Sequence, residues 1–477
     1  MKKKTKIVAT IGPASENKEI LRKMIQGGMN VARLNFSHGD YASHTRIIDT
    51  IRELSREMNT SIGIMADLQG PRIRTIIDND FEIKSGEKIL VYDSSIIQDT
   101  RYKIQDTRFF LLDYPGIIKD IEIGNEILIE DGLIKLKVSG KKDNYLEAEV
   151  IDGGTVKNEK GVNIPDAKLN IPVITPKDEE DLLFALGQNV DFVALSFVNC
   201  AKDILDLKDK IKKILGKEND LPRIVAKIER REAIKNMDEI IRETDAVMVA
   251  RGDLGIEIEE SKVAILQKEM IAKSLLNLKP VIVATQMLDS MIRNPRPTRA
   301  EVSDVSNAVI DHTDAAMLSG ESANGKYPVE SIETMSRIIN DTEGSPFDDV
   351  DAVLRTEQAS EYVDVIKGAF EISRSPEVKA ILVSSERGYT AQLISHFRPE
   401  KPIYAAVNKE IVYRQLSLIW GVEPYFFENS ASGEALIEKL IFRLKEDRVL
   451  KNGDKAVVII GKIEGGKKAN LIGVREV

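Results

Sequence analysis

Short apolar segments recur through the first two thirds of the chain, and most are separated by stretches with a helical pattern. The segments are Lys6–Ile11, Asn30–Asn35, Ser61–Asp67, Asp191–Phe197, Arg223–Glu229, Ala246–Asp253, Pro280–Met287 and Ala315–Glu321. Continuous Val, Ile and Ala runs without alternation are typical of parallel strands that are buried on both faces. Eight such strands with intervening helices predict a (β/α)8 TIM barrel.

The last residues of these segments are often polar. They include Arg33, Asn35, Asp67, Lys227, Glu229, Arg251, Asp253, Thr285 and Glu321. A barrel of this kind builds its active site at the carboxyl ends of its strands. Lys227 and Glu229, like Arg251 and Asp253, are two positions apart, so each pair should project to one side of its strand. The spacing therefore predicts that two carboxylates and two cations converge on one pocket.

The pattern changes after the third segment. From about Arg74 to Leu169 apolar and polar residues alternate, as in Ile134–Val138, and Gly-containing turns separate the runs. Alternation with such turns is typical of antiparallel hairpins. We expect a small β domain, a β-barrel, inserted at residues 72–169 into a catalytic barrel formed by residues 1–71 and 170–342.

Helix signals frame the rest of the barrel. Ser15 is a candidate N-cap for the first helix, and Thr175 followed by Pro176 is a strong helix start. The last barrel helix is expected around Pro328–Ile339, followed by a polar linker at Asp341–Ala359. Residues 343–477 should form a C-terminal doubly wound α/β domain. Its expected strands are Ala380–Ser384, Ile403–Val407, Pro424–Phe427, Ala456–Gly461 and Leu471–Val474.

Composition restricts the functional classes. The 477 residues are 42% hydrophobic and carry a net charge of −9 with both signs intermixed, which argues against a nucleic-acid partner. Cys200 is the only cysteine, so an intramolecular disulfide is impossible and a reducing compartment fits. The basic residues at the start precede too short an apolar stretch for a signal peptide, and no run reaches the ~20 residues of a membrane span. These features predict a cytoplasmic protein without a membrane partner.

The charged residues at the ends of the fifth and sixth segments suggest phosphoryl chemistry. A charge next to a core run is costly unless it is paired or bound to a ligand. Glu229 and Asp253 offer oxygen ligands only, which suits Mg²⁺. Lys227 beside such an ion can neutralise a phosphoryl group during transfer.

A second group of polar residues lies at the end of the second segment and just after it, in the stretch Ala32–Gly39. Asn35, Ser37 and Asp67 can form a cage of oxygen atoms, while His38 is equally suited to a loop hydrogen bond and to ligand binding. The histidines at 44, 312 and 396 have no companions at metal-ligand spacing and are expected to be structural, as is Cys200.

Together these segments resemble the pyruvate kinase family along essentially the whole chain. The matching motifs are Lys6–Pro13 (KIVATIGP), Ala32–Gly39 (ARLNFSHG), Asp67–Arg74 (DLQGPRIR), Lys160–Pro165 (KGVNIP), Ile224–Glu229 (IVAKIE), Met248–Gly255 (MVARGDLG) and Val283–Glu330. The resemblance is to bacterial members without an extra C-terminal phosphotransfer domain. It implies an allosteric, cytoplasmic, homotetrameric kinase that transfers a phosphoryl group from phosphoenolpyruvate to ADP in glycolysis, giving ATP and pyruvate.

The resemblance also implies residue roles. Lys227 stabilises the transferred phosphoryl group, Arg33 contacts it, and Gly252 and Thr285 lie at the substrate carboxylate or enolate. Glu229 and Asp253 hold Mg²⁺ or Mn²⁺. The nucleotide phosphates are expected near the residues Asn35, Phe36, Ser37, His38, Arg74 and Lys160.

Some positions depart from the family pattern. Many relatives have a glutamate where this chain has Arg72, with threonine and lysine at the positions of Leu68 and Gln69, and they need K⁺. The family K⁺ ligands correspond to Asn35, Ser37, Asp67 and Leu68, but we expect the charge of Arg72, close to this cage, to make K⁺ unnecessary. In the C-terminal domain Ser384–Thr390 (SSERGYT) resembles the phosphate-binding effector loop, with candidate contacts Ser384, Ser385, Arg387 and Thr390; Arg387 replaces a serine.

Two other functions stay open from the sequence. Lyases and mutases on similar barrels also bind enolates through Mg²⁺, but they lack an inserted domain with a nucleotide-facing lysine such as Lys160. A non-catalytic regulatory paralogue should have lost Lys227, Glu229, Asp253 or Thr285, and all four are present.

Overall fold

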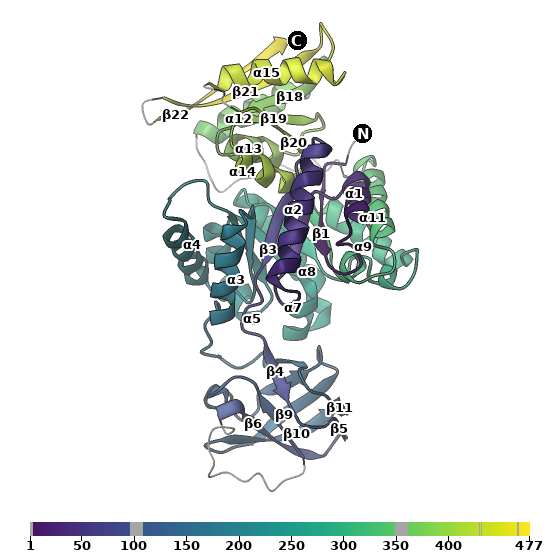
Figure 1. The fold of residues 1–477 in the computed structure, drawn as a ribbon, viewed down its shortest axis with the longest axis vertical. Coiled ribbons are helices and arrows are strands. Elements are labelled where there is room, and N and C mark those ends of the chain that lie inside the picture. Colours follow the sequence, from purple (N-terminus) through teal and green to yellow (C-terminus); the bar gives the residue numbers. More distant parts are fainter. Residues whose placement is uncertain (1–2, 96–107, 349–360, 429, 431, 465–466) are drawn as a thin grey trace.

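A computed structural model describes residues 3–95, 108–348, 361–428, 430, 432–464 and 467–477. Three parts follow one another along the long axis in Figure 1: the inserted β domain at one end, the parallel barrel in the middle and the C-terminal sheet at the other end. After the barrel strand β3 (Gly63–Asp67) the chain passes directly into the inserted domain.

The central part is a closed barrel of eight parallel strands, as the sequence predicts. The order around the barrel is β1-β17-β16-β15-β14-β13-β3-β2. The strands are β1 (Lys6–Ile11), β2 (Val31–Asn35), β3 (Gly63–Asp67), β13 (Phe192–Leu195), β14 (Arg223–Ile228), β15 (Ala246–Ala250), β16 (Val281–Ala284) and β17 (Ala315–Leu318). Small and medium side chains such as Val8, Met65 and Met248 fill the interior, so the barrel is a packed core.

Helices surround this barrel and bury their apolar faces on it. They are α1 (Lys18–Gly27), α2 (Tyr41–Glu57), α3 (Pro176–Gly187), α4 (Ala201–Leu215), α5 (Arg231–Lys235), α6 (Met237–Glu243), α7 (Arg251–Glu257), α8 (Glu260–Leu276), α9 (Arg299–Ile310), α10 (Gly320–Ala323) and α11 (Pro328–Glu343). Thr175 caps α3 in a capping box with Asp178, as predicted. The cap predicted at Ser15 is wrong: Asn17 accepts the backbone N–H of Glu19, and the Ser15 hydroxyl accepts that of Gly12.

One strand is shorter than the sequence suggests, and this changes the predicted pocket. β15 ends at Ala250, and α7 begins at Arg251. Arg251 and Asp253 therefore lie in a helical turn, where residues two apart point in different directions. The prediction that this pair projects to one side of a strand is wrong.

The inserted β domain is a second closed barrel, with the order β10-β6-β7-β4-β12-β8-β9. Its strands are β4 (Ile73–Ile76), β6 (Lys88–Asp93), β7 (Phe109–Leu112), β8 (Glu126–Ile129), β9 (Ile134–Lys141), β10 (Tyr145–Asp152) and β12 (Gly161–Asn163), and β5 (Phe81–Ile83) pairs separately with β11 (Gly154–Val156). The prediction of purely antiparallel structure is wrong at one pair, because β6 and β7 are parallel. The boundaries at residues 72 and 169 stay a prediction.

The C-terminal part is an open five-stranded sheet in the order β20-β19-β18-β21-β22, with α15 on one face and α12, α13 and α14 on the other. Its elements are α12 (Glu361–Ser373), β18 (Val378–Ser384), α13 (Tyr389–His396), β19 (Ile403–Val407), α14 (Glu410–Gln415), β20 (Val422–Phe426), α15 (Gly433–Glu446), β21 (Lys455–Glu464) and β22 (Lys467–Glu476). The last two strands form an antiparallel hairpin. The predicted linker starts inside α11, and its part at 349–359 lies outside the described residues.

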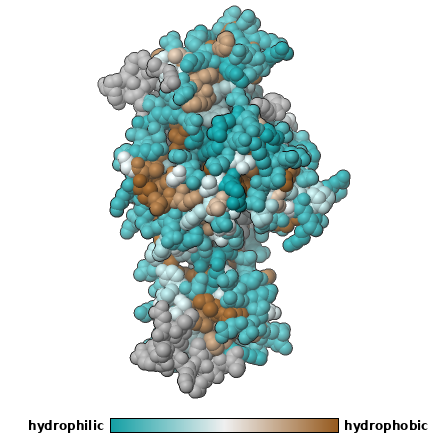
Figure 2. Space-filling view, in the orientation of Figure 1, coloured by the Kyte–Doolittle hydropathy of each residue, from teal (hydrophilic) through white to brown (hydrophobic). Residues whose placement is uncertain are grey.

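The surface is mostly polar. Figure 2 shows apolar patches on a largely hydrophilic face, one of them on the side where α3 and α4 lie in Figure 1; these helices carry the exposed side chains Leu183 and Leu205. Among the helices described, none combines the length and apolarity needed to cross a bilayer.

Candidate active site

Lys227 is the centre of a charged cluster at the carboxyl ends of the barrel strands. It lies near the end of β14 and is 9% exposed. Its ammonium Nζ donates to Ser196 Oγ at 2.7 Å and pairs with Glu229 Oε1 at 2.9 Å and Asp67 Oδ1 at 3.3 Å. The predicted convergence of a lysine on strand-end carboxylates is therefore present, although the second carboxylate in contact is Asp67 from β3.

Burial and charge oppose each other in this cluster. Burial disfavours the ammonium form of Lys227, but Asp67 and Glu229 outweigh it and raise the pKa. Burial also disfavours the Asp67 carboxylate, yet Lys227 and Arg33 more than compensate and lower its pKa. For Glu229 burial dominates, with Asp253 adding repulsion, and its pKa is raised despite Lys227. A cation bound between Glu229 and Asp253 would relieve both unfavourable effects.

Arg33 completes the positive side of the cluster. Its guanidinium donates from Nε to Asp67 Oδ2 at 2.6 Å and from Nη1 to Thr10 Oγ1 at 2.8 Å. Thr10 is in turn fixed by donating to the carbonyl of Leu318 at 3.0 Å. Two cations thus share the fully buried Asp67, which holds them side by side at the barrel mouth.

The donor set fits a divalent cation that keeps part of its water shell. Glu229 is 1% exposed, and its Oε2 accepts the backbone N–H of Phe197 at 2.8 Å. Asp253 is half-buried in the first turn of α7, and its negative charge contributes to the raised pKa of Glu229. No cluster of three or more His, Cys, Asp or Glu side chains occurs within the described ranges. Two carboxylates with open positions suit Mg²⁺ or Mn²⁺, which take further ligands from water and substrate.

Thr285 and Gly252 lie together beside Asp253. The Thr285 hydroxyl accepts the backbone N–H of Gly252 at 2.7 Å and donates to the carbonyl of Ala284 at 2.6 Å. Thr285 has a φ of +67°, a left-handed conformation that is costly for a β-branched residue. Strain of this kind at a strand end is typical of functional sites.

Arg251 does not join the predicted pocket. Its guanidinium pairs with Asp304 at 2.7 Å and donates to the carbonyl of Thr285 at 2.7 Å. The expectation of two converging cations from the fifth and sixth segments is therefore wrong for Arg251. Its bonds instead hold the strained turn that carries Thr285.

The predicted nucleotide segment after β2 is divided between surface and core. Asn35 Oδ1 accepts the backbone N–H of Ser37 at 3.2 Å, and the His38 side chain is exposed. Phe36 is 4% exposed and stacks on His44 with the ring centres 4.6 Å apart. The Phe36 side chain thus supports the loop from inside the protein, which leaves a ligand only its backbone. Asn35 lies opposite Asp67 in the β2–β3 pairing.

The candidate residues of the inserted domain have local partners. Lys160 pairs with Glu130 at 2.7 Å, and the Arg74 backbone N–H donates to Asp113 at 2.7 Å. Arg72 is exposed, and a Cβ added at Gly161 would lie 3.3 Å from its Nε. Within the described chain Arg72 has no hydrogen bond or ion pair with the cage of Asn35, Ser37, Asp67 and Leu68. Asp67 is neutralised there by Arg33 and Lys227.

The candidate effector residues lie at the end of β18 and the start of α13. Ser384, Ser385 and Thr390 are buried, and the Thr390 hydroxyl is hydrogen-bonded to Tyr362 at 2.7 Å. The Ser384 hydroxyl has no partner in the described part of the chain and lies near the N-terminus of α15, since a Cβ at Gly433 would be 2.8 Å from it. The Arg387 side chain is exposed and lines a different cleft.

Sequence reasoning missed Ser196. Its hydroxyl accepts the hydrogen bond of Lys227 and donates to the carbonyl of Leu68 at 2.7 Å. The next residue, Phe197, has a φ of +57° and presents its N–H to Glu229. The one available signal was that Ser196 is the polar residue near the end of the fourth apolar segment, as Lys227 is near the end of the fifth.

The fold and the site define the class of protein: a barrel phosphotransferase with an inserted domain. The family model described as pyruvate kinase, barrel domain, matches residues 2–332, and the one described as pyruvate kinase, alpha/beta domain, matches residues 364–475. The pyruvate kinases of Sporosarcina psychrophila and Geobacillus stearothermophilus are both 42% identical, over 96% and 97% of this chain and 78% of their own lengths. The crystal structure of a pyruvate kinase from Cryptosporidium parvum superposes with a TM-score of 0.90 at 35% identity, covering 99% of this chain and 96% of that one. The chain belongs to the pyruvate kinase family.

Proposed function

We propose that this chain transfers the phosphoryl group of phosphoenolpyruvate to ADP, giving ATP and pyruvate. The observation that carries the proposal is the buried contact of Lys227 with Glu229 and Asp67 next to Arg33. Two cations fixed by carboxylates at a barrel mouth are preorganised for the charge of a phosphoryl group in flight.

Each of these side chains has a role that follows from its position in the site. Arg33 and Lys227 bind the phosphoryl group, and Lys227 interacts most strongly when the group is between donor and acceptor. Gly252 and Thr285 orient the carboxylate end of the substrate through the backbone of the α7 start. When bound by Glu229 and Asp253, Mg²⁺ or Mn²⁺ supplies Lewis-acid charge stabilisation.

The inserted domain supplies residues that bind the nucleotide, and it excludes water from the active site. Lys160 and Arg74 face the phosphates of ADP, with the Asn35–His38 loop opposite. The domain contacts the catalytic barrel through the Asn163 side-chain amide, which donates to Glu257 at 3.2 Å. Closure about this contact would keep water from the phosphoryl group, which otherwise would be hydrolysed. Protonation of the released enolate then gives pyruvate.

The reaction is tested by measuring both products. Purified chain with phosphoenolpyruvate, ADP and Mg²⁺ should form ATP and pyruvate in a one-to-one ratio, with Glu229→Gln as the inactive control of equal size. Consumption of phosphoenolpyruvate without formation of ATP or pyruvate would favour the lyase or mutase alternative, and no turnover would favour a non-catalytic paralogue.

Metal binding has its own readout. Titration of Mn²⁺ followed by electron paramagnetic resonance should give one site in the wild type. Asp253→Asn and Glu229→Gln should each weaken it about 10-fold or more. A Mn²⁺ affinity that neither substitution changes would contradict the assigned ligands.

Assembly and location are proposed on the family resemblance. We infer a cytoplasmic homotetramer, and sedimentation velocity of the purified chain should give a species of four subunits. A monomer at micromolar concentration would contradict the tetramer.

A further inference from the structure

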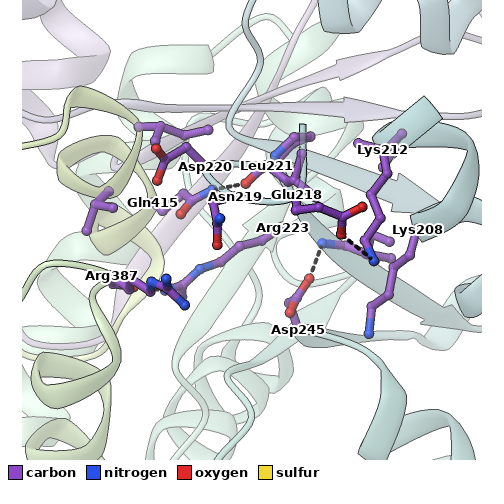
Figure 3. A pocket seen from close by; sticks show the side chains of 15 residues that line it. Lys208, Lys212, Glu218, Asn219, Asp220, Leu221, Arg223, Asp245, Arg387 and Gln415 are labelled. Carbon is purple, nitrogen blue, oxygen red and sulfur yellow. Dashed lines mark hydrogen bonds and ion pairs between the residues drawn. The ribbon is translucent and has the colours of Figure 1, made fainter. Parts of the chain in front are cut away.

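A cleft of about 310 Å³ lies between the catalytic barrel and the C-terminal domain, away from the carboxyl ends of the barrel strands. Figure 3 shows side chains that line it from both domains. Arg223, the first residue of β14, and the α4 residues Lys208 and Lys212 line it from the barrel. Arg387 and Gln415 line it from the C-terminal domain.

The carboxylates of the cleft already have partners. Glu218 pairs with Lys212 at 3.0 Å, and Asp220 pairs with Lys409 at 3.0 Å. Asp245 accepts the backbone N–H of Ile224 at 2.8 Å. Glu218 and Asp220 are thus paired with lysines, and no ion pair joins Asp245 to either arginine in the described chain.

Arg223 has only neutral hydrogen-bond partners. Its Nη1 donates to Gln392 Oε1 at 3.0 Å and its Nη2 to the carbonyl of Arg387 at 3.5 Å, and in the described chain no carboxylate pairs with it. Burial lowers its pKa, and Asp245 opposes this only in part. A half-buried guanidinium without an ion pair is an unfavourable arrangement that an anion would correct.

Arg387 adds a second cation from the other domain. It lies in the turn before α13, and its exposed side chain makes no hydrogen bond or ion pair within the described residues. Figure 3 shows the Arg223 side chain extending toward Arg387. The wall between them is fixed, because Gln415 donates to the carbonyl of Leu221 at 2.9 Å.

We propose that this cleft is a second anion site, in which Arg223 and Arg387 together bind the phosphate of a small phosphate monoester. Each planar guanidinium can bind two oxygens of an anion, and a phosphate has enough oxygens and charge for two guanidinium groups, whereas a monocarboxylate has only two oxygens and one charge. The volume lies at the small end of the range for ligand pockets and admits a short organic group beside the phosphate.

This site differs from the candidate effector loop. Ser384 points toward α15 on one face of the sheet, while the cleft includes α14 on the other face. The occupant of the cleft would contact both domains. It would also bind at the start of β14, the strand that carries Lys227 near its far end.

Binding is tested with glycerol 3-phosphate as the probe and glycerol as its neutral counterpart, by calorimetry on the full chain. Wild type should bind glycerol 3-phosphate and not glycerol. Arg387→Ala and Arg223→Gln should each weaken binding by about tenfold or more, as expected for loss of a charge-assisted contact. Arg374→Ala is the matched control, because Arg374 is an exposed arginine of the same domain.

Two further variants separate this cleft from other phosphate sites. Arg33→Gln tests the active site and Thr390→Val tests the effector loop, and neither should change the affinity for glycerol 3-phosphate. Binding that survives Arg387→Ala but disappears in either of these variants would overturn the proposal, as would absence of binding at millimolar probe. Arg387→Ala keeps the test decisive, since its side chain supports no contact that folding requires.

Discussion

Replacement of Lys227 by methionine separates a role in the transition state from a role in folding. Methionine keeps the length of the side chain and removes the charge. If Lys227 stabilises mainly the phosphoryl group in flight, Lys227→Met should lower kcat on the order of 10³-fold or more, which corresponds to about 4 kcal/mol of barrier. The KM for phosphoenolpyruvate should change little, because Arg33 and Thr285 remain.

The contacts of Lys227 also set a stability cost. Its removal leaves Glu229 and Asp67, which are 1% and 0% exposed, without their shared cation. Breaking a buried ion pair typically costs about 3–5 kcal/mol. Asp67 keeps its 2.6 Å contact with Arg33, so we expect a loss near the lower end of this range, measured by urea unfolding without divalent cation.

Lys279→Met is the matched control. Lys279 is a half-buried lysine of the barrel, and its ammonium donates to the carbonyl of Thr244 at 2.7 Å, in a region that also contains Arg223. The control should lose stability and keep its kcat in a lactate-dehydrogenase-coupled assay. A Lys227→Met enzyme whose kcat stays within tenfold of the wild type, with a raised KM as its main defect, would refute the assigned role.

Three other predictions concern the ion requirement, the effector loop and the pH dependence. Turnover should be nearly equal in Na⁺ or tetramethylammonium and in K⁺ buffer, and Arg72→Glu should create K⁺ dependence; a wild-type enzyme that is inactive without K⁺ would return Asn35, Ser37 and Asp67 to the role of potassium ligands. A sugar phosphate or nucleotide should shift the phosphoenolpyruvate saturation curve, and Ser384→Ala should reduce the shift; if no member of such a panel acts, the loop is structural. Burial and the charge of Arg398 lower the pKa of His396 to about 3, so the native state holds it neutral while the unfolded chain takes up a proton below about 6.5. Stability from this residue is complete above that pH and is lost as the pH falls toward 3, on the order of 2 kcal/mol by pH 5, and His396→Phe should flatten this part of the urea-unfolding profile; an unchanged slope would show that other groups cause it.

The sequence predicted the barrel well because parallel strands leave a strong local signal. Buried runs such as Ile224–Ala226 contain no polar residue, and a polar residue that follows many of these runs marks the carboxyl end of a strand. Lys227 and Glu229 could be identified in this way. The expectation that Arg251 and Asp253 project to one side of a strand failed, because the chain enters a helix immediately after Ala250 and no local pattern distinguishes this helix start from one more strand residue.

Features that depend on contacts between distant segments could not be predicted in this way. The parallel pairing of β6 and β7 was not predictable, because the alternation of side chains is the same for parallel and antiparallel neighbours. Arg72 was expected at the oxygen cage from its position in a motif, but Arg33 and Lys227 are the cations in contact with Asp67. Sequence position placed Arg72 near the hinge, and only the three-dimensional structure shows which cations reach the carboxylate.

The contacts of Asp67 also link the ion requirement to the catalytic chemistry. The carboxylate of Asp67 contacts both Arg33 and Lys227, and Asp67 is fully buried. A further monovalent cation on Asp67 would be repelled by Arg33 and Lys227, which already contact this carboxylate at 2.6 and 3.3 Å. Any K⁺ near this cage would therefore have to rely on the neutral oxygens of Asn35, Ser37 and Leu68. Arg33 and Lys227 stand in motifs that match the family, whereas Arg72 departs from the pattern of the K⁺-dependent relatives, so Arg72→Glu, measured with and without K⁺, is the variant that tests the prediction.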